Sequence, residues 1–226
     1  MLITRKGGYR MHKRLLLVIL AIVVAIPLQG CEKAKVWYVD FTTVTNLDEW
    51  LIEEDAPYIS THDAEGLYID GNKLTAPKGF TGDFVLTVVF TLDPPVGKYV
   101  NNFSISLTDG TTSPNEERIK AAFMNVGDDA IEHYSLIEED PYAELASGTG
   151  IAGINRTGTN TFIMTKEGNN LKLHMNTTQI CSVFCSSYSN IYSFPVLYIN
   201  DQMDERIILI KSIKVEYEGE MFNRPV

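Results

Sequence analysis

Apolar and polar residues alternate with a period of two along most of the chain that follows residue 35. The clearest run is residues 84–92, and the same alternation recurs at 103–108, 171–176, 194–198 and 206–217. Such alternation places one set of side chains on each face of a β-strand. No segment after residue 31 keeps the helical spacing i, i+3, i+4, i+7 over three turns. The pattern therefore predicts an all-β chain.

The residues that form the apolar face can be read for individual segments. In residues 84–92 they are every second residue from Phe84 to Leu92, and in the 194–198 segment they are Phe194, Val196 and Tyr198. In the last segment the phase slips near Lys211 and Ser212, which predicts a β-bulge there.

Turn residues separate these segments at intervals of about ten to fifteen residues. Many short strands at this spacing predict an antiparallel β-sandwich or jelly roll. No linker rich in proline and serine divides the body, so residues 36–226 are predicted to form a single domain, with 148–158 as its most flexible loop. The turn signals are Asp70-Gly71-Asn72, Pro77-Lys78-Gly79, Asp93-Pro94-Pro95, Asp109-Gly110 and Glu167-Gly168-Asn169-Asn170.

The first thirty residues have a different composition. Five bases and no acid occur in residues 1–14, and residues 15–26 are all apolar. As a helix, twelve residues span about 18 Å, which is short of the roughly 30 Å hydrocarbon core of a bilayer. A basic segment followed by a short apolar one is typical of a secretory signal peptide. We therefore expect residues 1–30 to be cleaved, whether the chain starts at Met1 or at Met11.

The sequence Leu28-Gln29-Gly30-Cys31 closes this segment and resembles the lipobox of bacterial lipoproteins, Leu-x-Gly/Ala-Cys. The resemblance implies that the Cys31 thiol becomes a diacylglyceryl thioether with further acylation such as palmitate, and that a peptidase cuts before it. Residues 31–35 would then be the lipidated cysteine and a short tether. The protein would be anchored in the bacterial cell envelope on the extracytoplasmic side. In such lipoproteins an aspartate after the lipidated cysteine signals retention in the inner membrane. This chain has Glu32 at that position, so the resemblance favours the outer membrane. An uncleaved signal anchor is the alternative.

Composition and charge narrow the function classes. The chain has 226 residues, of which 45% are apolar and 21% charged, as in ordinary globular proteins. Its formal net charge is −10, and removal of the five bases in residues 1–30 makes it −15. A nucleic-acid partner would require a basic surface, so this charge argues against one.

A second resemblance covers residues 36–218. The sequence around Leu47-Asp48-Glu49-Trp50, Gly66-Leu67-Tyr68 and Gly82-Asp83-Phe84, together with Ile210-Lys211-Ser212-Ile213, resembles concanavalin A-like (laminin G-like) jelly rolls. The resemblance implies a sandwich whose loops bind a carbohydrate or a protein. It also leaves open a structural calcium, since loop carboxylates suit a hard cation. The candidate calcium ligands, none of which stands out, are Asp63, Asp70, Asp128, Asp129 and Asp201.

Retaining glycosidases of the same superfamily carry two glutamates and an aspartate on one strand face, Glu-x-Asp-x-(x)-Glu, with two carboxyls about 5–5.5 Å apart. Glu138 and Asp140 fit the first two places, but Glu144 follows one residue late. Pro141 would also interrupt strand pairing. We therefore expect a protein without catalytic activity, and a glycan-cleaving hydrolase is the alternative.

Cys181 and Cys185 remain after the lipid-bearing cysteine, and an exported compartment permits a disulfide. Four residues of extended strand would place the two Cα atoms about 13 Å apart, beyond the roughly 7 Å limit for a disulfide. We predict that the segment turns and that the two cysteines bond. Two reduced cysteines on one strand face are the alternative.

Exposed aromatic side chains are common platforms for sugars in β-sandwiches. Trp50 is predicted to lie in the core, whereas Tyr142, Tyr188 and Tyr192 lie in polar surroundings and are the candidate ligand contacts. The histidines that follow the signal show no metal-ligand spacing. The sequence thus predicts a lipid-anchored β-sandwich that binds a glycan or a protein. A structural lipoprotein that docks another envelope protein through a sheet face is a further alternative.

Overall fold

The computed structural model describes residues 34–43, 47–53, 61–69, 71–94, 96–109, 117–127, 132–139, 142–185, 193–200 and 207–224. Every regular element among them is a β-strand, which confirms the all-β prediction. They belong to one compact unit, Ala34–Val226. Within these ranges no helix is long and apolar enough to span a bilayer. The predicted signal peptide and Cys31 lie outside the described residues.

The strands form two large antiparallel sheets. The described part of the first sheet has eight strands, in the order β14 (Thr178–Phe184), β13 (Asn170–Met175), β12 (Gly158–Glu167), β7 (Phe84–Leu92), β16 (Ile208–Tyr217), β4 (Gly66–Tyr68) and β3 (Thr61–Asp63), with β1 (Lys35–Asp40) also paired to β16. The second has seven, in the order β11 (Tyr142–Thr149), β10 (His133–Glu139), β9 (Glu117–Gly127), β8 (Tyr99–Thr108), β15 (Phe194–Asn200), β5 (Lys73–Thr75) and β2 (Leu51–Glu53). A short pair joins β17 (Met221–Asn223) to β6 (Lys78–Phe80).

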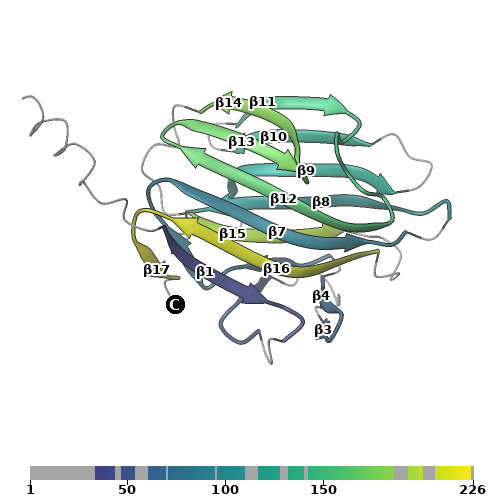
Figure 1. Ribbon diagram of the computed structural model, residues 1–226, viewed down its shortest axis with the longest axis horizontal. Helices are drawn as coiled ribbons and strands as arrows, with labels where there is room; N and C mark the ends of the chain where they lie inside the picture. The colour runs from purple at the N-terminus through teal and green to yellow at the C-terminus, as the bar shows by residue number, and fades with distance from the viewer. Residues whose placement is uncertain are drawn as a thin grey trace, which may run out of the picture. The chain divides into compact units, whose positions relative to one another are not determined.

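Figure 1 shows the two sheets lying one behind the other, with β12, β7 and β16 in front of β8, β9 and β10. A chain of phenylalanine rings fills the space between them. Phe90 of β7 contacts Phe103 of β8 at 5.0 Å between ring centroids, and Phe123 of β9 contacts Phe162 of β12 at 5.6 Å. Burial of each such side chain stabilises the fold by roughly 1.5–3 kcal/mol. The sandwich is therefore held by side chains from both sheets.

The alternation predicted for residues 84–92 is confirmed, because β7 buries every second residue from Phe84 to Leu92. The predicted bulge in the last long strand is also confirmed, since the β16–β7 register shifts between Ile210 and Ser212. Trp50 is 8% exposed and belongs to the core, as predicted.

The predicted apolar face of residues 194–198 is wrong. The core-facing residues of β15 are Leu197 and Ile199, and Leu197 pairs with the core residue Ile105 of β8. Phe194 and Val196, on the other face, are also buried. A strand that is buried on both faces does not reveal by alternation which face meets the core.

Hydrogen bonds anchor the connection between β11 and β12, which includes most of the loop predicted to be flexible. The guanidinium of Arg156 donates two hydrogen bonds of 2.8 Å to the buried Glu132 carboxylate. The fully buried Asn160 accepts from the Asn155 backbone N–H at 2.7 Å and donates to the Asn155 carbonyl at 2.7 Å. Gly148 and Thr149 belong to β11 itself.

Candidate functional site

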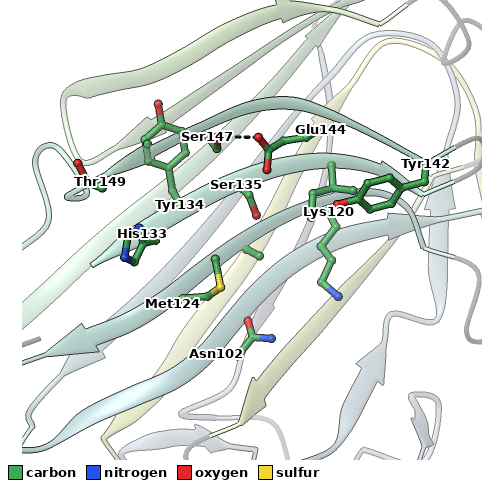
Figure 2. Close-up of a pocket in the computed structure, with 13 residues that line it drawn as sticks. Asn102, Lys120, Met124, His133, Tyr134, Ser135, Tyr142, Glu144, Ser147 and Thr149 are labelled. Carbon is green, nitrogen blue, oxygen red and sulfur yellow. Dashed lines mark hydrogen bonds between the residues drawn. The ribbon is translucent and has the colours of Figure 1, made fainter. Parts of the chain in front are cut away.

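A hollow of about 550 Å³ lies on the outer face of the seven-stranded sheet, over β8, β9, β10 and β11 (Figure 2). These four strands are consecutive in the chain and pair as successive antiparallel neighbours. The residues that line the hollow are Asn102, Lys120, Ala122, Met124, His133, Tyr134, Ser135, Ile137, Tyr142, Glu144, Ser147, Gly148 and Thr149.

Strand register explains the shape of the hollow. Alternate residues of a strand point to the same face, so paired residues of neighbouring strands form rows across the sheet. The middle row contains only small side chains, namely Ser104, Ala122, Ser135 and Ser147. One flanking row is Asn102, Met124, His133 and Thr149, and the other is Ser106, Lys120, Ile137 and Glu144. Over β9, β10 and β11 the small residues Ala122, Ser135 and Ser147 lie between two rows of longer ones and make the floor of a trough that crosses the strands. At β8 the hollow is lined by Asn102, and Ser104 is fully buried. Three strand spacings give it a length of about 14 Å.

The polar groups differ between the two sides of the trough. Figure 2 shows Tyr142 on one side and His133 with Thr149 on the other. The Tyr142 side chain is 69% exposed, so its ring is available to a ligand. The Glu144 carboxylate accepts a hydrogen bond of 2.7 Å from the Ser147 hydroxyl. This hydrogen bond holds one oxygen of the Glu144 carboxylate beside Ser147 in the middle row of the trough.

Buried polar atoms that find no hydrogen-bond partner within the described residues occur along β8. Asn102 lines the hollow, and its Oδ1 atom is buried with no hydrogen-bond partner. The hydroxyls of Ser104 and Ser106, both 0% exposed, also have none. Each unsatisfied buried polar group costs about 1–3 kcal/mol. Of these residues only Asn102 lines the hollow, so a ligand hydroxyl that donated a hydrogen bond to its Oδ1 atom would recover part of that cost.

The carboxylates singled out from the sequence do not share a face. Glu144 lines the hollow and pairs with Ile137 of β10. Glu138 follows Ile137 directly and therefore points to the opposite face of the sheet. Asp140 lies outside the described residues. Among the described lining residues Glu144 is the one carboxylate, whereas retaining glycosidases require two about 5–5.5 Å apart.

Of the candidate aromatic contacts, Tyr142 lines the hollow, whereas Tyr188 and Tyr192 lie outside the described residues. Asn102, Lys120, Met124 and His133 were not predicted as site residues. Each of them lies on the face of its strand opposite the core residues. Knowledge of the register of β8 to β10 would therefore have identified them. The sequence did not reveal this register, since residues 117–127 do not alternate cleanly.

Cys181 lies within β14, and Cys185 follows the last residue of that strand. The structure does not join them, because β14 runs extended through Phe184. Burial raises the pKa of the Cys181 thiol above its usual value, and a hydrogen bond with the Leu173 backbone partly opposes this. The disulfide stays a prediction, as does the lipidation of Cys31.

The described residues contain no cluster of three or more His, Cys, Asp or Glu side chains able to hold a metal ion. Of the candidate calcium ligands only Asp63 is described, and its carboxylate accepts the Glu65 backbone N–H at 2.8 Å. Asp70, Asp128, Asp129 and Asp201 lie outside the described residues. The structural calcium therefore stays an untested expectation.

No model of a known protein family matches the chain, and no curated protein matches its sequence. Solved structures do match its fold. The VIP36 exoplasmic/lumenal domain, solved with Ca²⁺ and Man3GlcNAc, is 10% identical with a TM-score of 0.58, over 81% of this chain and 89% of that one. The fold is a concanavalin A-like jelly roll.

Two further structures agree with this fold. The CBM2 module of the evolved Dit protein of Lactobacillus casei BL23 phage J-1 is 13% identical with a TM-score of 0.57, over 86% of this chain and 99% of that one. The Crh5 transglycosylase, solved with NAG, is 12% identical with a TM-score of 0.54, over 84% of this chain and 88% of that one. At such low identity the structural similarity establishes the jelly-roll fold alone. The function has to be inferred from the site.

Proposed function

We propose that this jelly roll binds a neutral glycan, without cleaving it, in the trough over β8 to β11. The observation that carries the proposal is the trough itself, which combines the exposed Tyr142 ring with the buried Asn102 Oδ1 atom, for which no described residue is a hydrogen-bond partner. Concave sites lined by aromatic side chains and a few placed polar groups are typical of small-molecule recognition.

The chemistry of the trough suits a sugar. A tyrosine offers an apolar ring face with a polar tip, and sugar rings have apolar C–H faces bordered by hydroxyls. Asn102 Oδ1 and the Glu144 carboxylate would accept hydrogen bonds from sugar hydroxyls. The trough spans four strands, about 14 Å, so it is an extended site and not a pocket for one small group.

Charge favours a neutral glycan over an acidic one. The net charge is −10 for the full chain and −15 without residues 1–30. In the trough itself the carboxylate of Glu144 is matched by the ammonium group of Lys120, so the trough does not offset the negative field of the molecule. An anionic ligand would approach against this field.

We propose further that the protein is anchored through lipidated Cys31 on the extracytoplasmic side of a bacterial membrane. The lipobox sequence Leu28-Gln29-Gly30-Cys31 supports this proposal. Four residue steps separate Cys31 from Lys35, the first residue of β1, and an extended chain spans at most about 14 Å over that length. The jelly roll would therefore stay close to the bilayer surface.

The test is binding of neutral oligosaccharides to the purified protein, first on a glycan array and then by calorimetry. Tyr142→Ala should weaken the Kd about tenfold, which corresponds to about 1.4 kcal/mol of lost contact. Tyr99→Ala is the matched control, because Tyr99 is 40% exposed on β8 but does not line the hollow.

Equal affinity in the wild type and Tyr142→Ala would place the glycan elsewhere. Absence of binding to every neutral glycan would reject the proposal. Release of reducing ends from a bound glycan would instead establish the hydrolase alternative.

A further inference from the structure

β14 is the last strand of the eight-stranded sheet. It pairs with β13 on one side and, within the described residues, with no strand on the other. Its sequence, Thr-Gln-Ile-Cys-Ser-Val-Phe, contains no charged residue, no proline and no glycine. Long uncharged edge strands are templates for pairing with another chain, and proteins usually protect them.

The other described edges are protected. β11 carries Glu144, and its pairing with β10 has a register shift between Leu136 and Ile137. β3 and β2 are three residues long, and β1 carries Lys35 and Asp40. The pairing of β14 with β13 also shifts register, between Leu173 and His174, but β14 is the one long edge in the described structure that carries no charged residue.

Backbone hydrogen bonding shows which groups of β14 are available. The Cys185 N–H donates to the Asn169 carbonyl of the β13 side at 2.8 Å. In an antiparallel ladder alternate residues point toward the same neighbour, so Val183 and Cys181 also point toward β13. Ser182 and Phe184 then present their N–H and C=O groups outward, and both side chains are exposed, Phe184 by 65%.

We propose that β14 pairs antiparallel with β14 of a second copy of this chain, which makes one sheet continuous across a two-fold axis. An antiparallel strand is compatible with itself, as an isologous interface requires. The charge of the molecule favours this edge for contact between copies, because each copy carries −15 without residues 1–30 and none of that charge lies on β14. Elsewhere like charges would oppose one another.

This pairing goes beyond glycan binding and does not depend on it. A dimer would carry two troughs, so a polymeric glycan that reached both would bind with increased avidity. The edge interaction is measurable whether or not any glycan is found.

The test is the oligomeric mass of the full mature protein by sedimentation equilibrium in a density-matched detergent. The wild type should have twice the mass of the chain. Ser182→Lys should be monomeric, because pairing would bring the new ammonium groups of the two copies close together across the two-fold axis. The control is Tyr38→Lys, which places the same charge on β1 at a side chain that is 55% exposed, and it should remain dimeric.

A second variant tests the backbone directly. Ser182→Pro removes an outward N–H and leaves the β13–β14 hydrogen bonds intact, so it should also give monomers with unchanged far-UV dichroism. A monomeric wild type up to the solubility limit would overturn the proposal. So would a dimeric Ser182→Lys, or dissociation by Tyr38→Lys.

Discussion

Burial of the Cys181 thiol within β14 governs how fast this residue reacts. Desolvation raises its pKa, and the thiolate is the reactive form. In reduced protein freed of reductant we therefore expect iodoacetamide to alkylate Cys181 more slowly than an unstructured thiol at about pH 8. The rate should rise about tenfold per pH unit until the raised pKa is passed. Peptide mass spectrometry gives the rate, with urea-unfolded protein as the control. Equal native and unfolded rates would contradict the burial.

The same reagent, applied without prior reduction, decides the predicted disulfide. Cys181 and Cys185 should both resist labelling if they are bonded, and both should be recovered as thiols if β14 stays extended. The sequence left this open because spacing alone does not reveal whether five residues turn or continue a strand. The sequence did identify Trp50 as a core residue and Tyr142, which lies among acidic residues, as exposed.

At the level of elements, the β11–β12 connection contains an ion pair between the half-exposed Arg156 and a buried carboxylate. The Glu132 side chain is 1% exposed and receives both hydrogen bonds from Arg156. Arg156→Ala would leave that carboxylate buried without a counter-charge, at a cost of about 2–4 kcal/mol. Urea unfolding should therefore show a lower midpoint with an unchanged slope.

The matched control for this prediction is Lys172→Ala on β13. Its partner Glu167 lies at 2.6 Å, but the two side chains are 36% and 58% exposed. Such a surface pair contributes about 0–1 kcal/mol. Equal losses in the two variants would show that the Glu132–Arg156 pair is no more important than a surface contact.

Strands with clean alternation were predictable, whereas strands with mixed polarity were not. β7 alternates throughout and β16 slips at its bulge, so both were visible in the sequence. β15 is buried on both faces, and its core face was assigned wrongly. β9 places Ala121 and Ala122 side by side and a left-handed Asn125 near its end, which hides the period of two.

For the whole molecule, the jelly roll followed from the sequence but the trough did not. Many short alternating strands allow few architectures, so fold class was predictable. The trough depends on the register among four strands, which brings Ser104, Ala122, Ser135 and Ser147 into one row. A shift of one residue in any pair would turn those side chains to the other face. Register was set by packing that the sequence pattern did not specify.

The proposed attachment of the whole molecule to a membrane rests on one thiol. Acylation at Cys31 should make the mature protein incorporate labelled palmitate and partition into detergent, because two or more acyl chains anchor a protein stably. Cys31→Ser should lose the label and change the mass of the product, since cleavage before residue 31 depends on the lipidated cysteine. Cys181→Ser, which removes a thiol from β14 instead, should keep the label and the wild-type processing. If Cys31→Ser retained the label and the mature mass, the envelope anchor would have to be abandoned, while the jelly roll and its trough would stand.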